Sequence, residues 1–447
     1  MSRAARARPN PNDANSPGAR LVLLTLALLT ARCSGCTNAC SPEPTDPVDA
    51  ASAPEPVPPE PQTTTSSATR APTGRTPEPR LLPGAQAPAV VALAVTPDAK
   101  RLVAAGHDAS WIWSLETGEL IRTLPAVGES ISLSADGATL IALHFDGPAD
   151  PKAPRLSSSV DFYDLATGQR TRSHPKQARA VAWSPNGKLI GTSGPDGVAI
   201  WDPPSGKVLW RVATPDGPPS RVLAFSFNGE RLASGQDNHQ IHQFSVDEGY
   251  AVRELPVKDQ VLALAFSSDG DVLATGDLPE PGLYSAETGQ LLRRLIGHWT
   301  YVSALAFSPD RKTLASGSVD RTIRTWDWRS GRALGVFRAH DRPVTAVVWT
   351  AGGRVLISAG EDGLIRIWDA AKSSLELSLS ALPTTAGAPP EWISWTKDAD
   401  YLASPGAPPL LEWRGEAGTL DFAALAAEHA QPSRVAATLT RLLNPKP

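Results

Sequence analysis

The hydrophobic pattern along the chain is periodic from Val90 onward. Short apolar runs alternate with turns made of Gly, Asp, Asn and Pro, and a run such as TIRTWD sets Ile323 and Trp326 among polar neighbours. This pattern is typical of short strands that are separated by turns. It predicts an all-β protein built from a repeated unit of about 40 residues.

Eight copies of the unit are recognised from two landmarks, a turn similar to SPDG and the aromatic residue of the third apolar run. The landmarks are 16 or 17 residues apart in seven units and 28 apart in the second. In chain order they are Pro97 and Trp113, Ala135 and Tyr163, Pro185 and Trp201, Phe227 and Phe244, Ser268 and Tyr284, Pro309 and Trp326, Ala351 and Trp368, and Lys397 and Trp413. Four short strands per unit predict a β-propeller blade, so we expect eight blades, with seven as the alternative.

A histidine, a hydroxyl residue, an aspartate and a tryptophan recur at nearly constant spacing in three units. The sets are His174, Thr192, Asp196 and Trp201; His298, Ser316, Asp320 and Trp326; and His340, Ser358, Asp362 and Trp368. Histidine, serine and aspartate also form hydrolase triads, but a set that occurs three times does not fit a single catalytic centre. We therefore predict structural hydrogen-bond networks, because buried polar groups are tolerated when they satisfy one another.

The motifs GH, SPD, LASGSVD and IRTWD resemble those of the WD-repeat family, most closely in the third, sixth and seventh units. The resemblance covers about Leu81 to Phe422. In that family each repeat forms one blade, with strands a to d running outward from the central channel. The resemblance implies that each His, Ser/Thr, Asp and Trp set joins the d–a loop of its blade to strands b and c.

The resemblance also implies a non-catalytic scaffold that binds an unidentified protein or peptide on one rim of the propeller. Aromatic residues and arginines dominate the binding energy of protein interfaces. The candidates are Trp299, Tyr301, Arg342 and Lys176 in d–a loops and Arg321 in a b–c turn. Extra residues between strands b and c of the second unit are either a tolerated insertion or a partner-binding loop.

The sequence offers little for catalysis. It contains no phosphate-binding glycine loop, HExxH motif or zinc-ligand spacing, so we predict no catalytic residue, cofactor or metal. Two alternatives stay open. The segment WDPPSGKVLWRV around Trp210 resembles the docking motif of quinoprotein dehydrogenases, which would place an enzyme site in the central channel, and the chain could instead be a passive structural envelope protein. A net charge of −4 argues against nucleic acid as the partner, and we expect a monomer.

The N-terminal region has the pattern of an export signal. Basic residues precede Leu21–Ala31, an apolar run too short to span a bilayer, and all three cysteines follow it. This resembles a bacterial lipoprotein signal with Cys36 as the lipidated residue. The predicted domains are a signal at 1–35, a disordered Pro/Ser/Thr-rich tether at 36–80, the propeller at 81–422 and a helical extension at 423–447. The predicted location is the cell envelope, lipid-anchored to the outer membrane, with a periplasmic or secreted soluble protein as the alternative.

Overall fold

The computed structural model of the chain describes residues 78–81, 87–107, 109–125, 128, 130–145, 157–213, 220–236, 239–338, 340–383, 390–415, 418–420 and 428–444. The predicted signal, Cys36 and nearly all of the predicted tether lie outside these residues, as does most of the insertion of the second unit. Within the described part, no helix is both long and apolar enough to cross a membrane.

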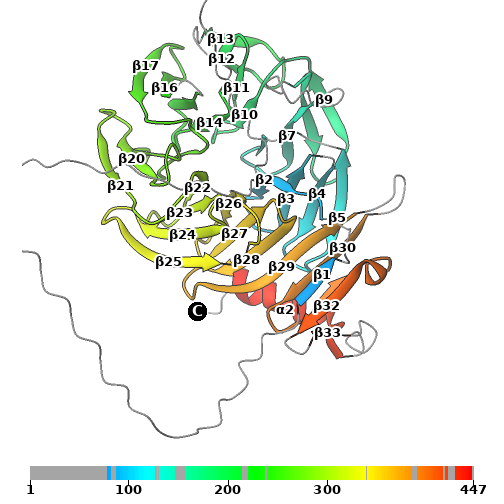
Figure 1. Cartoon of the computed structure of the whole chain (residues 1–447). Coiled ribbons are helices and arrows are strands. Elements are labelled where there is room, and N and C mark those ends of the chain that lie inside the picture. The colour runs from blue at the N-terminus through cyan, green and yellow to red at the C-terminus, as the bar shows by residue number, and fades with distance from the viewer. Residues whose placement is uncertain are drawn as a thin grey trace, which may run out of the picture. The chain divides into compact units, whose positions relative to one another are not determined.

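Six four-stranded antiparallel sheets and the first four strands of a six-stranded sheet form the seven blades of a β-propeller (Figure 1). In each blade the first strand is innermost and the fourth is outermost. Blades 1 to 3 comprise β2 (Val90–Val95), β3 (Arg101–Gly106), β4 (Ala109–Ser114) and β5 (Leu120–Pro125); β6 (Ile131–Leu133), β7 (Thr139–His144), β8 (Ser159–Asp164) and β9 (Arg170–His174); and β10 (Ala180–Trp183), β11 (Ile190–Gly194), β12 (Gly197–Trp201) and β13 (Val208–Val212).

The remaining blades follow in the same order. Blades 4 to 7 comprise β14 (Val222–Phe225), β15 (Arg231–Gly235), β16 (Gln240–Ser245) and β17 (Ala251–Pro256); β18 (Leu264–Phe266), β19 (Val272–Thr275), β20 (Gly282–Ser285) and β21 (Leu291–Arg294); β22 (Val302–Phe307), β23 (Thr313–Ser318), β24 (Thr322–Asp327) and β25 (Arg332–Arg338); and β26 (Val344–Trp349), β27 (Val355–Gly360), β28 (Leu364–Asp369) and β29 (Ser374–Leu382).

The prediction of eight blades is wrong, because the ring closes after the seventh. The inner strand β26 of blade 7 packs directly on β2 of blade 1. The Thr345 hydroxyl on β26 donates a hydrogen bond to the Val90 carbonyl on β2 at 2.5 Å. No inner position is left for an eighth blade.

The residues assigned to an eighth blade extend blade 7 outward instead. Strands β30 (Glu391–Thr396) and β31 (Tyr401–Ala403) continue its sheet beyond β29, which makes a six-stranded sheet. A short 3-10 turn, Pro408–Leu410, leads to β32 (Leu411–Gly415), which pairs with β33 (Gly418–Leu420) and with β1 (Glu78–Leu81). The eighth unit is therefore an accessory layer on the outer edge of the seventh blade.

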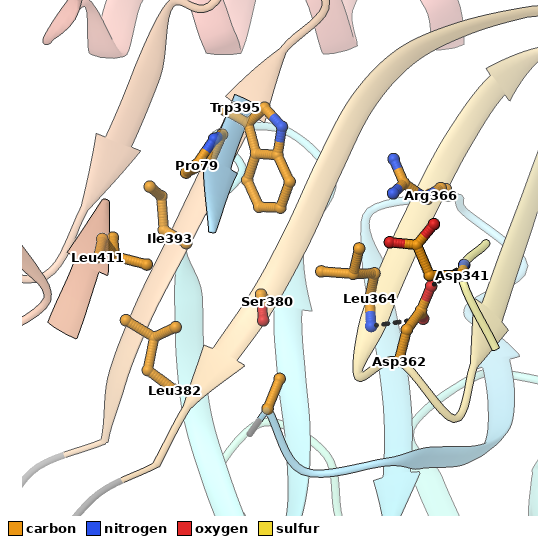
Figure 2. A pocket seen from close by; sticks show the side chains of 11 residues that line it. Pro79, Asp341, Asp362, Leu364, Arg366, Ser380, Leu382, Ile393, Trp395 and Leu411 are labelled. Carbon is orange, nitrogen blue, oxygen red and sulfur yellow. Dashed lines mark hydrogen bonds between the residues drawn. The ribbon is translucent and has the colours of Figure 1, made fainter. Parts of the chain in front are cut away.

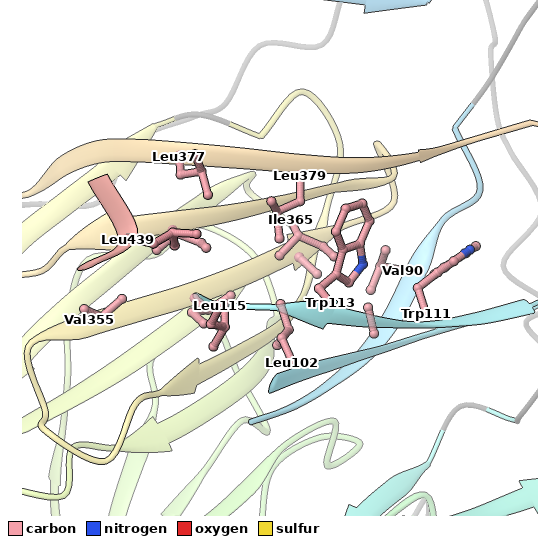
Figure 3. Packing of buried hydrophobic residues seen from close by; sticks show 14 of the residues in the cluster. Val90, Leu102, Trp111, Trp113, Leu115, Val355, Ile365, Leu377, Leu379 and Leu439 are labelled. Carbon is pink, nitrogen blue, oxygen red and sulfur yellow. The ribbon is translucent and has the colours of Figure 1, made fainter. Parts of the chain in front are cut away.

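The helix α2 (Pro432–Leu443) packs at the junction between blades 7 and 1. Its apolar side chains Val435, Leu439 and Leu442 are buried in a cluster with residues of both blades. Figure 3 shows Leu439 beside Leu377 of blade 7 and Leu115 of blade 1. Burying such a face removes apolar surface from water and holds the closing blades together.

Candidate functional site

In blade 6 the four repeated residues lie within hydrogen-bonding distance of one another. His298 Nδ1–H donates to Asp320 at 2.7 Å, and the Ser316 hydroxyl donates to His298 Nε2 at 2.8 Å. The Trp326 indole N–H donates to Ser316 Oγ, also at 2.8 Å. Burial alone would raise the pKa of Asp320, but hydrogen bonds from His298 and Thr322 lower it to about 2. The aspartate is thereby held as a carboxylate inside the blade.

Blade 7 repeats this geometry. His340 Nδ1 lies 3.0 Å from a carboxylate oxygen of Asp362, and the Ser358 hydroxyl bonds to His340 Nε2 at 2.8 Å. Trp368 donates to Ser358 Oγ at 3.0 Å. In both blades the serine is completely buried, so its hydroxyl cannot reach a substrate as a nucleophile would.

In blade 3 the rings of His174 and Trp201 pack edge to face, with centroids 5.4 Å apart, but the four residues are not joined by hydrogen bonds. His174 Nε2 lies 3.3 Å from the Pro203 carbonyl, and Asp196 forms an ion pair of 2.6 Å with Arg211 on the surface. The indole nitrogen of Trp201 is buried without a hydrogen-bond partner among the described residues. The network predicted for this blade is therefore absent.

The candidate binding residues lie mainly around blades 6 and 7. Trp299 and Arg321 line one groove, and Arg342 is exposed in the loop after β25. The Tyr301 hydroxyl donates to Asp259 of the preceding d–a loop at 3.0 Å. Lys176 lies apart, in blade 3, where its ammonium sits 4.9 Å from the centroid of the Trp201 ring. Burial, aided by the charge of Arg211, lowers the pKa of Lys176.

The most exposed apolar residue of this region was missed in the sequence. Ile296 is 77% exposed, three residues before Trp299 at 75%, and Tyr301 is 40% exposed in the same loop. Ile296 comes two residues after the end of β21 at Arg294, and an isoleucine beyond the end of a strand is the signal that could have revealed it. Large apolar side chains grouped on a surface typically mark interaction sites.

The groove that contains Trp299 and Arg321 lies between blades 6 and 7 and has a volume of about 630 Å³. Its further charged residues are Asp320, Arg324, Arg338, Asp341 and Arg366. Arg321 adopts φ of +69°, in the left-handed region that residues other than glycine rarely adopt. Its turn is closed by a hydrogen bond from the Arg321 N–H to the Ser318 carbonyl at 3.1 Å.

A second, smaller pocket of about 170 Å³ lies against the six-stranded sheet (Figure 2). One end is apolar and is formed by Pro79, Leu382, Ile393, Trp395 and Leu411. The other end is charged, with Asp341, Asp362 and Arg366. Asp341 and Arg366 line the groove as well as the pocket, so the two cavities adjoin.

Two further features of the described residues bear on metal binding and on the quinoprotein resemblance. No group of three His, Cys, Asp or Glu residues in the described ranges is placed to hold a metal ion. The Trp210 indole, part of the segment that resembles a quinoprotein docking motif, donates to the Val246 carbonyl of the next blade at 2.6 Å. This contact joins blades 3 and 4.

Comparison with known proteins finds a repeat family that matches two segments of the chain. A model of the family "WD domain, G-beta repeat" matches residues 289–327 and 331–369. The first match contains the complete set of blade 6, from His298 to Trp326, and the second contains the complete set of blade 7, from His340 to Trp368. Each match covers the last strand of one blade and the first three strands of the next. Together with the seven-bladed ring described above, the two matches support a WD-repeat β-propeller.

Three curated proteins illustrate what this chain is similar to. Periodic tryptophan protein 2 of Arabidopsis thaliana is 29% identical over 49% of this chain and 25% of the relative. Nuclear distribution protein PAC1 of Coccidioides posadasii is 29% identical over 34% of this chain and 37% of its own length. Autophagy-related protein 16 of Arabidopsis thaliana is 24% identical over 62% of this chain and 47% of its own. The chain thus spans a quarter to about half of these relatives.

The relatives correct the predicted location. They are proteins of a plant and a fungus, which have no bacterial envelope, and one is named for nuclear distribution. The prediction of a bacterial protein anchored to an outer membrane is therefore wrong. None of the three names describes a catalysed reaction.

Proposed function

We propose that this WD-repeat propeller is a non-catalytic scaffold that binds a protein or peptide through the rim of blades 6 and 7. The observation that carries the proposal is the loop between β21 and β22, which holds three large apolar side chains in solvent. Ile296, Trp299 and Tyr301 are 77%, 75% and 40% exposed. Exposed apolar surface of this kind has an energetic cost that binding to a partner removes.

The residue types of the rim support the same proposal. Tryptophan, tyrosine and arginine contribute most of the binding energy at protein interfaces, and this rim combines Trp299, Tyr301, Arg321 and Arg342. The histidine networks beneath the rim fix the loops that carry these side chains. The Trp299 backbone N–H, for example, donates to the Asp320 carboxylate at 3.4 Å. Lys176 in blade 3 is a separate candidate, since it lines a different pocket together with Arg211.

The test compares a rim variant with a matched control by crosslinking in cells followed by mass spectrometry. The rim variant carries Ile296→Ser, Trp299→Ala and Tyr301→Ala. The control carries Tyr250→Ala and Val252→Ser, which remove apolar side chains that are 52% and 43% exposed on blade 4. We expect the rim variant to lose specific crosslinked partners that the wild type and the control retain. Identical partners in all three proteins would contradict the proposal.

Unfolding of the three proteins must be measured alongside. Because the substituted side chains are exposed, we expect their free energies of unfolding to stay within about 1 kcal/mol of the wild type. If a variant loses a partner while its free energy of unfolding is unchanged, the substituted side chains themselves are needed for binding.

A further inference from the structure

The extra strands of blade 7 leave part of its sheet without a neighbouring blade. Blade 6 ends at its fourth strand, β25, whereas the sheet of blade 7 continues through β30 and β31. The small pocket lies on this outer part, where Ser380 on β29 pairs with Leu364 on β28 and with Ile393 on β30. Figure 2 shows Ser380 between the apolar end of the pocket and the end that carries Arg366 and Asp341.

The adjoining groove contains arginines that lack counter-ions. Within the described residues, Arg321, Arg324 and Arg338 form no ion pair and donate no side-chain hydrogen bond. Other arginines of this protein are paired, such as Arg294 with Asp277 at 3.1 Å and Arg354 with Asp369 at 3.2 Å. The Nε atom of Arg324 is also buried without a hydrogen-bond partner in the described part of the chain. Such a donor favours an acceptor supplied from outside.

The carboxylates of the groove do not neutralise these arginines. Asp320 is engaged by His298 and Thr322, with hydrogen bonds of 2.7 and 2.6 Å. Asp341 is exposed and lies where the groove meets the pocket. Arg321 and Arg338 stand together, because Arg338 is paired with Thr322 across β24 and β25. The groove therefore carries an excess of positive charge on a protein whose net charge is −4.

We propose that the groove and the pocket together bind an acidic peptide segment that carries one large apolar side chain. The apolar side chain enters the pocket between Trp395 and Leu382, and the acidic groups lie against Arg321, Arg324 and Arg338. A pocket of about 170 Å³ holds a single side chain, and the longer groove of about 630 Å³ holds the flanking residues. This inference rests on the proposed scaffold function, to which it adds the chemistry of the partner.

The chemistry favours a peptide over a nucleic acid. An RNA or DNA partner would be bound by a broad basic surface that contacts many phosphates. Here the basic residues are confined to one groove, and the adjoining pocket is lined mainly by apolar side chains. The anionic groups of the peptide could be carboxylates or phosphates, since arginine binds both through charge-assisted hydrogen bonds.

The test measures binding of short fluorescent peptides to the full chain by anisotropy at low ionic strength. The probe has a central leucine flanked by aspartates, and matched probes replace the leucine by alanine, the aspartates by lysines, or the aspartates by phosphoserines. A single-stranded RNA of similar length is the competing ligand. We expect the wild type to bind the aspartate and phosphoserine probes at least about tenfold more tightly than the lysine probe. Tighter binding of one anionic probe identifies the acidic group that the groove prefers.

Two protein variants assign the effect to this site. Arg321→Glu with Arg338→Glu should weaken binding of the acidic probe by about tenfold or more. The control, Arg332→Glu with Lys207→Glu, changes the net charge equally at exposed positions outside the groove and should weaken binding much less. Ser380→Leu, which fills the pocket, should abolish the preference for leucine over alanine while the preference for aspartate over lysine persists.

The inference is overturned if the wild type does not prefer the acidic probe, if RNA binds better, or if both charge variants act alike. Failure of the scaffold proposal has a different signature, since the rim variant would then keep all its crosslinked partners.

Discussion

His298 Nδ1 lies 2.7 Å from the carboxylate of Asp320, and neither side chain has any exposed surface. The pair comes from the d–a loop that precedes blade 6 and the b–c turn within it. It therefore ties together the two loops that carry Trp299 and Arg321. Because the pair is completely buried, each partner would be left with an unsatisfied polar group if the other were removed.

The first prediction concerns this network. His298→Ala should lower the free energy of unfolding by about 1–3 kcal/mol, because Asp320 and Ser316 lose their shared partner. His174→Ala in blade 3 should cost less, since His174 makes a single hydrogen bond of 3.3 Å to Pro203. Urea unfolding of the two variants measures the difference. Equal losses of unfolding free energy in the two variants would show that the network of blade 6 stabilises the protein no more than the single hydrogen bond of His174.

The second prediction concerns pH. A carboxylate whose pKa is lowered in the folded state stabilises the fold above its unfolded pKa, and this stability is lost as the pH falls through the folded pKa. The pKa of Asp320 is lowered from 3.8 to about 2. The stability advantage of the wild type over Asp320→Asn should therefore shrink by up to about 2 kcal/mol between pH 5 and pH 2. A constant advantage across this range, measured by urea unfolding, would rule out a lowered pKa.

The third prediction concerns the closure of the ring. Leu439→Ala should destabilise the protein by about 2–5 kcal/mol, because it leaves a cavity in the buried cluster between blades 7 and 1. Thr440→Ala on the exposed side of the same helix should change the free energy of unfolding by about 0.5 kcal/mol or less. If the two substitutions prove equivalent, α2 does not hold the closing blades together.

The fourth prediction concerns Gly118, which has φ of +82° in the turn between strands c and d of blade 1. A Cβ atom there would lie 2.8 Å from the Val435 Cγ1 atom of α2. Gly118→Ala should lower the free energy of unfolding by about 1 kcal/mol or more because of backbone strain. The close contact with Val435 should add a further loss. A double-mutant cycle with Val435→Ala isolates the loss that comes from the contact, which should be smaller when residue 435 is alanine. Strict additivity would show that the helix does not press on this turn.

The fold class could be predicted from the sequence because strand patterning and turn residues are local. The number of blades could not. Lys397 and Trp413 keep the spacing of the other units, yet the run Glu391–Thr396 pairs with β29 instead of forming an inner strand. The strand that packs against β2 is set by the number of blades that close the ring. This number is a property of the whole ring, and the spacing of residues within one unit does not reveal it.

The networks show the same limit on a smaller scale. Ser316 and Trp326 are ten residues apart, as are Ser358 and Trp368, whereas Thr192 and Trp201 are nine apart. In blade 3 the strands turn tightly, with Gly194 paired to Gly197, so Asp196 stands at the tip and meets Arg211. A difference of one residue in a turn changes which side chains can meet.

Part of the groove lining was named from the sequence, whereas its role in binding stays a prediction. Trp299 and Arg321 were identified by residue type and loop position, and the structure places them in one groove. The pocket beside Ser380 could not have been predicted, because it exists where accessory strands extend one sheet beyond its neighbour. Most of the loop insertion of the second blade lies outside the described residues, and its role stays a prediction.

The most direct test of the scaffold proposal places a photo-crosslinking amino acid at position 299 of the full chain in its native cell. The same group at position 250, exposed on blade 4, is the control. We predict discrete protein adducts from position 299 that are absent from position 250. No adduct at position 299, or the same adducts at both positions, would contradict the proposal that this rim binds a partner.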